Sequence, residues 1–212
     1  MIISHKHKFI FIKSRKTAGS SIQAALAKHC GEEDIIVNEN FTGQNLDKIP
    51  KFIAHEHCIL QYLKQYTKPD IWNNYFKFNF IRNPFDIAIS RYHWDLKNEK
   101  TSIEGFREWV KNDKLEVDDI LFPYICDDVT NSKLRCTWPY QNMDLDFVGR
   151  YEQLDKDLDY ISKKLKLPKL ELPQLKTGFR KKTKKIEEYY DKETKNIVKE
   201  FFKFDLNQFY ME

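Results

Sequence analysis

The stretch KFIFIKSRKTAGSSIQAAL, residues 8–26, decides the fold class of this chain. Residues 8–13 show little alternation between apolar and polar side chains, which predicts a buried strand of the parallel type. From Gly19 onward, apolar residues recur at the spacing of one helix face. A strand, a basic loop and a helix in this order predict the opening of a β-α-β unit.

The loop in this stretch has the wrong residue order for a nucleoside-triphosphate P-loop. That motif is Gly-x-x-x-x-Gly-Lys-Ser/Thr, with the lysine after the second glycine. Here Lys16 precedes Gly19, and no other glycine precedes the lysine in the loop. Free N–H groups at a helix start still favour an anion, and Arg15, Ser20 and Ser21 would add charge and hydroxyl donors. The alternative is an ordinary strand-to-helix turn with Ser/Thr capping.

The rest of the chain repeats the alternation of strands and helices. This alternation predicts an α/β fold, a parallel sheet with helices on both faces, in one domain over residues 1–212. Residues 32–50 are polar and predict a connection, and residues 113–142 have no clear pattern. The predicted strands are 51–55, 75–81 and 145–152, and the predicted helices are 58–66, one from just past Arg82, 106–110, 154–165 and one through 197–202.

Composition excludes several classes of protein. With 41% hydrophobic residues in 212, the chain can form a globular core, and its net charge of +4 gives no support for nucleic-acid binding. The short N-terminal apolar runs predict neither a signal peptide nor a membrane span, so we expect a cytoplasmic protein with no membrane partner. The four cysteines form no Cys-x-x-Cys pair, which fits a reducing compartment, although a bridge between Cys126 and Cys136 stays open.

Three segments place polar groups at the carboxyl ends of predicted strands, where ligands bind in parallel α/β sheets. They would put Lys16, His55 and Arg82 along one rim. A guanidinium at Arg82 can fork onto a phosphate, but an ion pair with Asp86 is the alternative. Ser90 lies roughly 10 Å further along the helix, so only a ligand lying along that helix touches both residues.

Three motifs resemble those of sulfotransferases. KTAGSS (16–21) resembles the 5′-phosphosulfate-binding loop of the carbohydrate-type and bacterial branch. FKFNFIRNPFDIAISRYH (76–93) resembles the 3′-phosphate segment, and DFVGRYEQL (146–154) resembles a later strand-to-helix junction. The resemblance spans nearly the whole chain. It implies a single sulfotransferase-like domain with a P-loop-like sheet and 3′-phosphoadenosine 5′-phosphosulfate (PAPS) as donor. No metal is expected, because no spacing of histidine, cysteine or carboxylate residues suggests a metal site.

The resemblance also implies residue roles, carried over by position. Lys16 would contact the oxygen that bridges phosphate and sulfate. Arg82 and Ser90 would hold the 3′-phosphate, Tyr151 would lie near the adenine, and Arg180 with Lys181 would form a basic segment over the 3′-phosphate. The residue after this pair is Lys182, where relatives have glycine. The residues around the 5′-phosphate would be Thr17, Ala18, Gly19, Ser20 and Ser21.

Sulfuryl transfer to a hydroxyl needs a base for the acceptor and positive charge at the leaving phosphate. Lys16 can supply the charge, and a histidine with a pKa near neutral suits the base. The resemblance favours His55 as base, with His57 as its competitor. Glu56 or Glu152 is the fallback.

The acceptor is expected to be a hydroxyl of a carbohydrate, while the oligomeric state is not predicted. Tyr189 and Tyr190 could line an acceptor groove or simply pack. Two other functions stay open. One is a P-loop kinase or nucleotide hydrolase, and the other is a non-catalytic polyanion-binding module that uses the basic run FRKKTKK (179–185).

Overall fold

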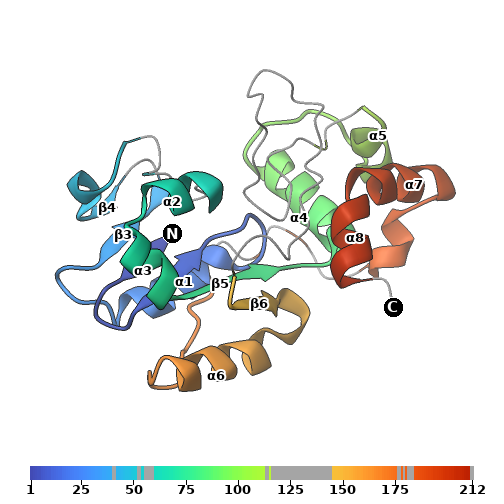
Figure 1. Cartoon of the computed structure of the whole chain (residues 1–212). Coiled ribbons are helices and arrows are strands. Elements are labelled where there is room, and N and C mark those ends of the chain that lie inside the picture. The colour runs from blue at the N-terminus through green and yellow to red at the C-terminus, as the bar shows by residue number, and fades with distance from the viewer. Residues whose placement is uncertain are drawn as a thin grey trace. The chain divides into compact units, whose positions relative to one another are not determined.

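The computed structural model describes residues 1–39, 42–51, 54, 60–112, 115, 145–175, 178, 180 and 184–210. Figure 1 labels the elements. The strands are β1 (Ile2–Ser4), β2 (Phe9–Ile12), β3 (Ile35–Val37), β4 (Gly43–Gln44), β5 (Phe76–Ile81) and β6 (Phe147–Arg150). The helices are α1 (Gly19–Ala27), α2 (Leu60–Tyr66), α3 (Pro69–Asn74), α4 (Pro84–Lys97), α5 (Phe106–Lys111), α6 (Leu154–Lys164), α7 (Lys192–Phe201) and α8 (Lys203–Phe209), with short 3₁₀ turns η2 (Leu46–Lys48), η5 (Tyr151–Gln153) and η6 (Ile186–Tyr189).

The described residues pack into two compact units. The first contains the sheet and comes from residues 1–81 and 145–175, apart from the gaps already named. The second comes from residues 82–112, 115 and 178–210, and it contains α4, α5, α7 and α8. A single domain over residues 1–212 stays a prediction.

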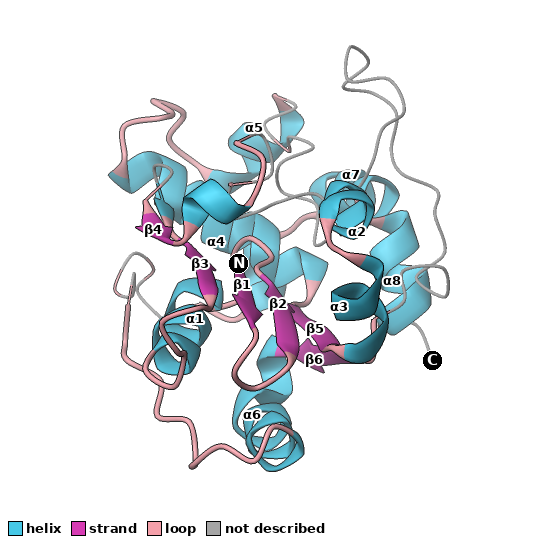
Figure 2. Cartoon of the chain, turned by 60° about the vertical axis from the view of Figure 1, so that its left-hand side comes forward, coloured by secondary structure: helices cyan, strands magenta, loops and turns pink. Residues whose placement is uncertain are grey.

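The sheet has a parallel centre and an antiparallel edge. Its strand order is β4-β3-β1-β2-β5-β6, and β5 runs parallel to both β2 and β6. Figure 2 shows these strands with the helices around them. The α/β class and the strand-loop-helix opening are therefore confirmed. The three strands β1, β3 and β4 pair antiparallel, which the alternation of strands and helices did not predict.

Two sequence predictions change in this edge region. Residues 32–50 were expected to be only a connection, but they contain β3 and β4. The segment 35–37 is too short for a periodic signal, and its pairing with β1 makes it a strand. The predicted strand 51–55 is described only at Lys51 and Ala54; Lys51 lies in a turn, and the Ala54 N–H donates to the carbonyl of Pro50 at 3.2 Å.

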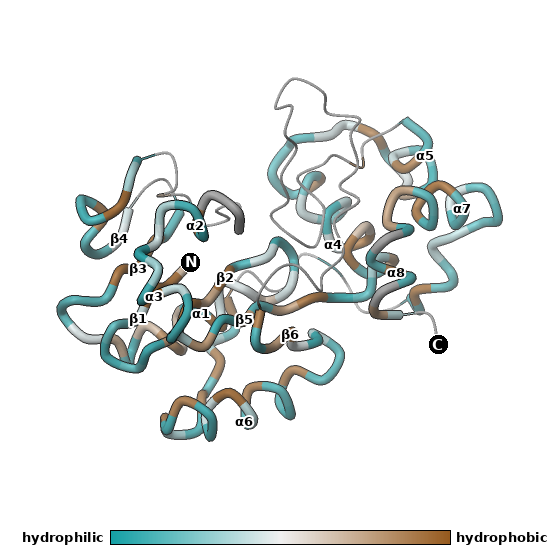
Figure 3. Tube along the Cα trace, in the orientation of Figure 1, coloured by the Kyte–Doolittle hydropathy of each residue, from teal (hydrophilic) through white to brown (hydrophobic). Residues whose placement is uncertain are grey.

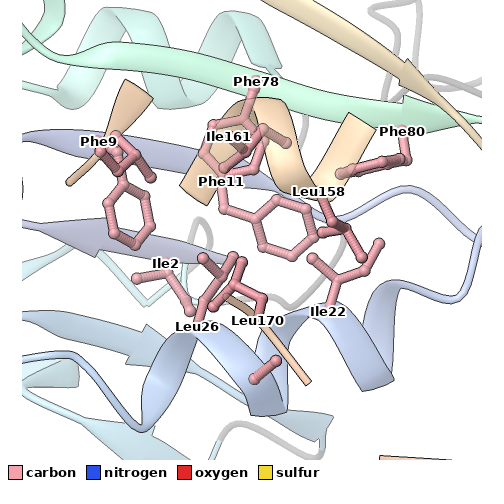
Figure 4. Close-up of a cluster of buried hydrophobic side chains, with 12 residues drawn as sticks. Ile2, Phe9, Phe11, Ile22, Leu26, Phe78, Phe80, Leu158, Ile161 and Leu170 are labelled. Carbon is pink, nitrogen blue, oxygen red and sulfur yellow. The ribbon is translucent and has the colours of Figure 1, made fainter. Parts of the chain in front are cut away.

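Alternation along the central strands builds the core of the first unit. Phe9 and Phe11 of β2 point to the same sheet face as Phe78 and Phe80 of β5, and all four are fully buried (Figure 4). α1 and α6 cover this face with apolar side chains, among them Ile22, Leu26, Leu158 and Ile161. The alternating colours along α6 in Figure 3 reflect its apolar and polar sides.

Helices also cover the opposite face of the sheet. Lys77 of β5 points away from the phenylalanine face, and its ammonium lies 5.8 Å from the centroid of the Trp72 ring in α3. The prediction of helices on both faces is thus confirmed. Gly149 of β6 is required by close packing, since a Cβ there would lie 2.4 Å from the Phe80 ring.

In the second unit, α4 begins as its sequence predicts. Asn83 is the N-cap, and its side chain accepts a hydrogen bond from the N–H of Phe85 at 2.9 Å. Pro84 occupies the first helical position, where its missing N–H costs nothing.

The predicted helices at 58–66, 106–110, 154–165 and 197–202 are confirmed as α2, α5, α6 and α7.

Cys30 is the free cysteine among the described residues, and it is half-buried. Burial and the nearby Asp34 carboxylate raise the pKa of its thiol to about 12. Cys30 is therefore a poor nucleophile at neutral pH. Cys58, Cys126 and Cys136 lie outside the described residues, so the bridge between the last two stays open.

Candidate active site

The loop between β2 and α1 has a backbone shape suited to an anion. Lys16 and Ala18 both have left-handed backbone conformations, with φ of 60° and 63°. Left-handed residues next to right-handed ones turn successive N–H groups toward one side, and such a concavity binds anions. Since Ala18 is followed directly by Gly19, the first residue of α1, the two left-handed residues lie at the positive end of the helix.

Hydrogen bonds within the loop and from β5 hold this loop in place. The hydroxyl of Thr17 donates to the carbonyl of Ser14 at 3.1 Å, and the amide of Asn79 in β5 donates to the hydroxyl of Ser14 at 3.1 Å. All three side chains are buried. The loop is therefore anchored to the centre of the sheet, and its backbone is positioned before any ligand arrives.

Gly19 is required where α1 passes over the end of β2. A Cβ at this position would lie 2.7 Å from Cγ of Lys13 and 3.1 Å from the carbonyl oxygen of Ser14. The first of these distances is shorter than real side chains tolerate. Glycine is thus required at this position because Lys13 and Ser14 lie too close for a side chain, and not because of a positive φ. Its small size lets the helix start pack closely against the loop.

The start of α1 carries no competing charge among the described residues. No acidic side chain lies in its first turn, and no side chain caps it, because the N-cap is Ala18. The alternative of a Ser/Thr-capped turn is therefore wrong. Ser21 is buried and accepts a hydrogen bond from the N–H of Leu175 at 3.3 Å, whereas Ser20 is partly exposed.

The second candidate cluster lies at the start of α4. Nε and Nη2 of Arg82 donate to Oδ2 of Asp86 at 2.8 and 2.6 Å. Nη1 of Arg180 donates to Oδ1 of the same carboxylate at 2.5 Å. The ion pair between Arg82 and Asp86 that sequence offered as the alternative is thus present. It also brings the two predicted phosphate-binding arginines together, in a cluster with a formal charge of +1.

A polar stripe runs along α4 from this cluster. Asp86, Ser90 and His93 follow at intervals of four and three residues and so share one helix face. Nε2 of His93 lies 3.2 Å from the hydroxyl of Tyr189. Burial, followed by the charge of Arg180, lowers the pKa of His93. His93 was not among the predicted site residues, although its spacing of three residues from Ser90 places both on one helix face.

The remaining predicted residues are only partly described. Tyr151 opens η5 directly after β6, whose last residue pairs with Ile81, the last residue of β5. Glu152 is exposed in the same turn. His55, Glu56, His57 and Lys181 lie outside the described residues, so the base assignment stays a prediction.

Fold and loop together define an α/β protein with an anion-adapted helix start. Residues 1–211 match the model of the sulfotransferase family, and the chain belongs to this family. An uncharacterized protein of Archaeoglobus fulgidus is 33% identical over 98 residues, which cover 46% of this chain and 73% of that protein. No solved structure matches the chain significantly.

Carbohydrate sulfotransferases are similar to about half of the chain. Carbohydrate sulfotransferase 14 of Danio rerio is 26% identical over 137 residues, covering 55% of this chain and 37% of that protein. Carbohydrate sulfotransferase 10 of Xenopus laevis is 26% identical over 118 residues, covering 53% of this chain and 29% of that protein. The matched part is thus a minor share of each of these relatives. Within the described part of this chain, no helix has the length and apolar character needed to cross a membrane.

Proposed function

We propose that this chain transfers a sulfuryl group from PAPS to a hydroxyl of a carbohydrate. The observation that carries the proposal is the β2–α1 loop, with its left-handed Lys16 and Ala18 at an uncapped helix start within a sulfotransferase-family chain. The names of the relatives favour a carbohydrate as acceptor.

The 5′ side of the donor is assigned to the loop. Backbone N–H groups from Thr17 to Ser21 would hold the 5′-phosphate, as helix starts hold phosphate in other proteins. The side chain of Lys16, with Arg15 beside it, would bring positive charge to the phosphosulfate. The tight contact at Gly19 supports this assignment, because it brings the first turn of α1 close to the loop.

The 3′ side of the donor is assigned to Arg82, Ser90 and the basic pair Arg180 and Lys181. Arg82 and Arg180 share the Asp86 carboxylate, which leaves one net positive charge for a phosphate dianion. Guanidinium groups bind phosphate through paired N–H donors, so this pair of arginines suits the 3′-phosphate. Tyr151, which follows β6, is assigned to the adenine.

The reaction itself breaks one sulfur–oxygen bond and makes another. The acceptor oxygen bonds to sulfur, while the bond from sulfur to the 5′-phosphate oxygen breaks and its electron pair leaves with adenosine 3′,5′-bisphosphate. His55 would take the hydroxyl proton as general base, with His57, Glu56 and then Glu152 as lower-ranked candidates. Lys16 would stabilise the negative charge that grows on the leaving phosphate, so no metal ion is needed.

The first test measures binding of adenosine 3′,5′-bisphosphate and adenosine 5′-monophosphate by calorimetry. We expect micromolar or tighter binding of the bisphosphate, about tenfold or more tighter than the monophosphate. Absence of binding, or a Mg²⁺-dependent preference for ATP, would contradict the proposal. Labelled PAPS with a panel of glycans then tests transfer and acceptor class together, and we expect EDTA to leave turnover unchanged.

The base is tested with His55→Ala, with His57→Ala as the matched variant. We expect the first variant to lose turnover by about 100-fold or more while it still binds the bisphosphate. The second variant should retain most turnover. The reverse pattern would move the base to His57, and normal turnover in both would exclude a histidine base from this segment.

A further inference from the structure

Arg180 is held on three sides within the second unit. Its Nη1 donates to Asp86, and its Nη2 donates to the carbonyl of Lys184 at 3.2 Å. The third contact is aromatic: Cζ of Arg180 lies 5.0 Å from the centroid of the Tyr189 ring. A guanidinium at this distance over an aromatic face is attracted by the negative charge of that face. The guanidinium of Arg180 thus lies over the Tyr189 ring, and both of its Nη groups donate hydrogen bonds, whereas its buried Nε has no partner among the described residues.

Tyr189 is itself fixed from several directions. Its hydroxyl lies 3.2 Å from Nε2 of His93, and its ring meets the rings of His93 and Phe106 edge to face at 5.9 and 5.6 Å. Its backbone carbonyl accepts a hydrogen bond from Nε of Arg107 at 3.1 Å. These contacts come from α4 and α5, so the ring is held in one orientation by two helices.

The neighbouring Tyr190 has a different role. Its ring packs edge to face on Phe85 at 5.3 Å and on Phe106 at 4.9 Å, and its hydroxyl donates to the carbonyl of Phe85 at 2.7 Å. Burial raises the pKa of this hydroxyl far above its ordinary value. Tyr190 is therefore a packing residue, whereas the adjacent Tyr189 contacts Arg180.

We propose that Tyr189 is a positioning residue that determines the preference of this protein for a nucleotide with a 3′-phosphate. The inference rests on the proposed function, which assigns Arg82 and Arg180 to that phosphate. Tyr189 holds the guanidinium of Arg180 beside Asp86, where it adjoins Arg82. Without the ring, Arg180 keeps its charge but loses the support of its plane, and the paired donors lose their alignment. Recognition of the 5′-phosphate by the β2–α1 loop does not involve this contact.

The test compares binding of the two nucleotides to variants at the paired tyrosines. Tyr189→Leu should weaken binding of adenosine 3′,5′-bisphosphate about tenfold and leave that of adenosine 5′-monophosphate within about twofold, because only the first uses Arg180. Tyr189→Phe keeps the aromatic face and should retain most of the preference. Tyr190→Phe is the matched control and should bind both nucleotides like the original protein. Thermal unfolding confirms that each variant is folded.

A double-mutant cycle separates positioning from general damage. In an Arg180→Ala background, Tyr189→Leu should have no further effect on bisphosphate binding. Arg180→Lys offers a second route if Tyr189→Leu does not fold. It keeps the charge without the planar group, and it should lose a similar part of the preference.

Three results would overturn the inference: equal weakening of both nucleotides by Tyr189→Leu, full effects in the Arg180→Ala background, or full preference in Arg180→Lys. Failure of the proposed function looks different, because the original protein would then show no preference for the bisphosphate at all. A clear preference that is insensitive to Tyr189 would leave the proposed function intact and exclude the positioning role.

Discussion

The β2–α1 loop and the cluster of Arg82, Asp86 and Arg180 offer an anion two different kinds of chemistry. The loop presents backbone N–H groups, and its shape comes from two left-handed residues and a close approach at Gly19. The cluster presents side-chain charges, and Asp86 and Arg180 are 94 residues apart in the chain. The loop is thus built within one short segment, whereas the cluster exists only after distant segments have packed. Backbone changes and loss of the Lys16 charge should damage the first region, and changes of protonation should damage the second.

The largest effect is expected at the one side chain of the loop that the mechanism uses. Lys16→Ala should lower turnover about 100-fold to 1000-fold, because the leaving phosphate loses its positive partner. Binding of adenosine 3′,5′-bisphosphate should change much less. Lys28→Ala is the matched loss of charge. Lys28 is exposed at the C-terminal end of α1, the helix that follows the loop, so this variant should leave turnover unchanged. Equal loss of turnover in both variants would point to net charge rather than to Lys16.

The next effect tests the close approach at the helix start. Gly19→Ala should lower the free energy of unfolding by about 1–3 kcal/mol, because the new Cβ meets the side chain of Lys13 at 2.7 Å. Gly31→Ala is the matched substitution. Its Cβ would lie 3.3 Å from Cδ of Lys6, a flexible side chain that can move aside. Urea unfolding of both variants measures the difference, and similar stability in the two would show that Gly19 is not constrained.

A smaller effect of opposite sign is expected one residue earlier. Ala18→Gly should raise the free energy of unfolding by about 0.5–1 kcal/mol, because glycine adopts the left-handed conformation without the cost that alanine carries. Ala24→Gly, inside α1, should lower it by about the same amount. If both variants were destabilised, the left-handed conformation of Ala18 would not be a source of strain.

The smallest effect concerns protonation in the second region. Burial and the Arg180 charge lower the pKa of His93, so the folded state favours neutral imidazole. The unfolded chain therefore binds this proton more readily. The stability that neutral His93 contributes is full above its ordinary pKa and is lost as the pH falls through that value toward the lowered one.

His93→Gln tests this contribution through the pH dependence of unfolding. Between about pH 7.5 and about pH 5.5, the original protein should lose more stability than the variant. The variant removes one titrating group and leaves the other histidines in place. A variant with the same or steeper loss of stability in acid would show that His93 does not couple to folding.

Much of the fold could be predicted because its signals are local. The signals for the strand 75–81, for the helix from just past Arg82 and for the helix 154–165 each lie within a short segment, and these elements were confirmed as β5, α4 and α6. β3 could not be predicted, since three residues carry no period and only pairing with β1 stabilises them. The antiparallel edge was missed for the same reason.

The same distinction between local signals and contacts of distant segments holds for the candidate site. The order of residues from Lys16 to Ser21 and the segment from Arg82 to Ser90 were sufficient, by resemblance, to indicate the family, which the match over residues 1–211 confirmed. Sequence could offer a phosphate ligand or an ion pair with Asp86 as alternatives for Arg82, but it could not connect Arg180 to the same carboxylate. It also could not separate the roles of Tyr189 and Tyr190, which are adjacent and chemically alike.

The sequence by itself determined the α/β class and the strand-loop-helix opening, because hydrophobic period and helix-start chemistry act over a few neighbouring residues. The family of this protein was indicated by the resemblance of its motifs, and the match over residues 1–211 confirmed it. Only the tertiary structure decided the left-handed conformations of Lys16 and Ala18, the ion pairs of two arginines with Asp86 and the contact between Tyr189 and Arg180. These contacts depend on which segments meet in the folded chain, and neither a local pattern nor a residue count contains that information.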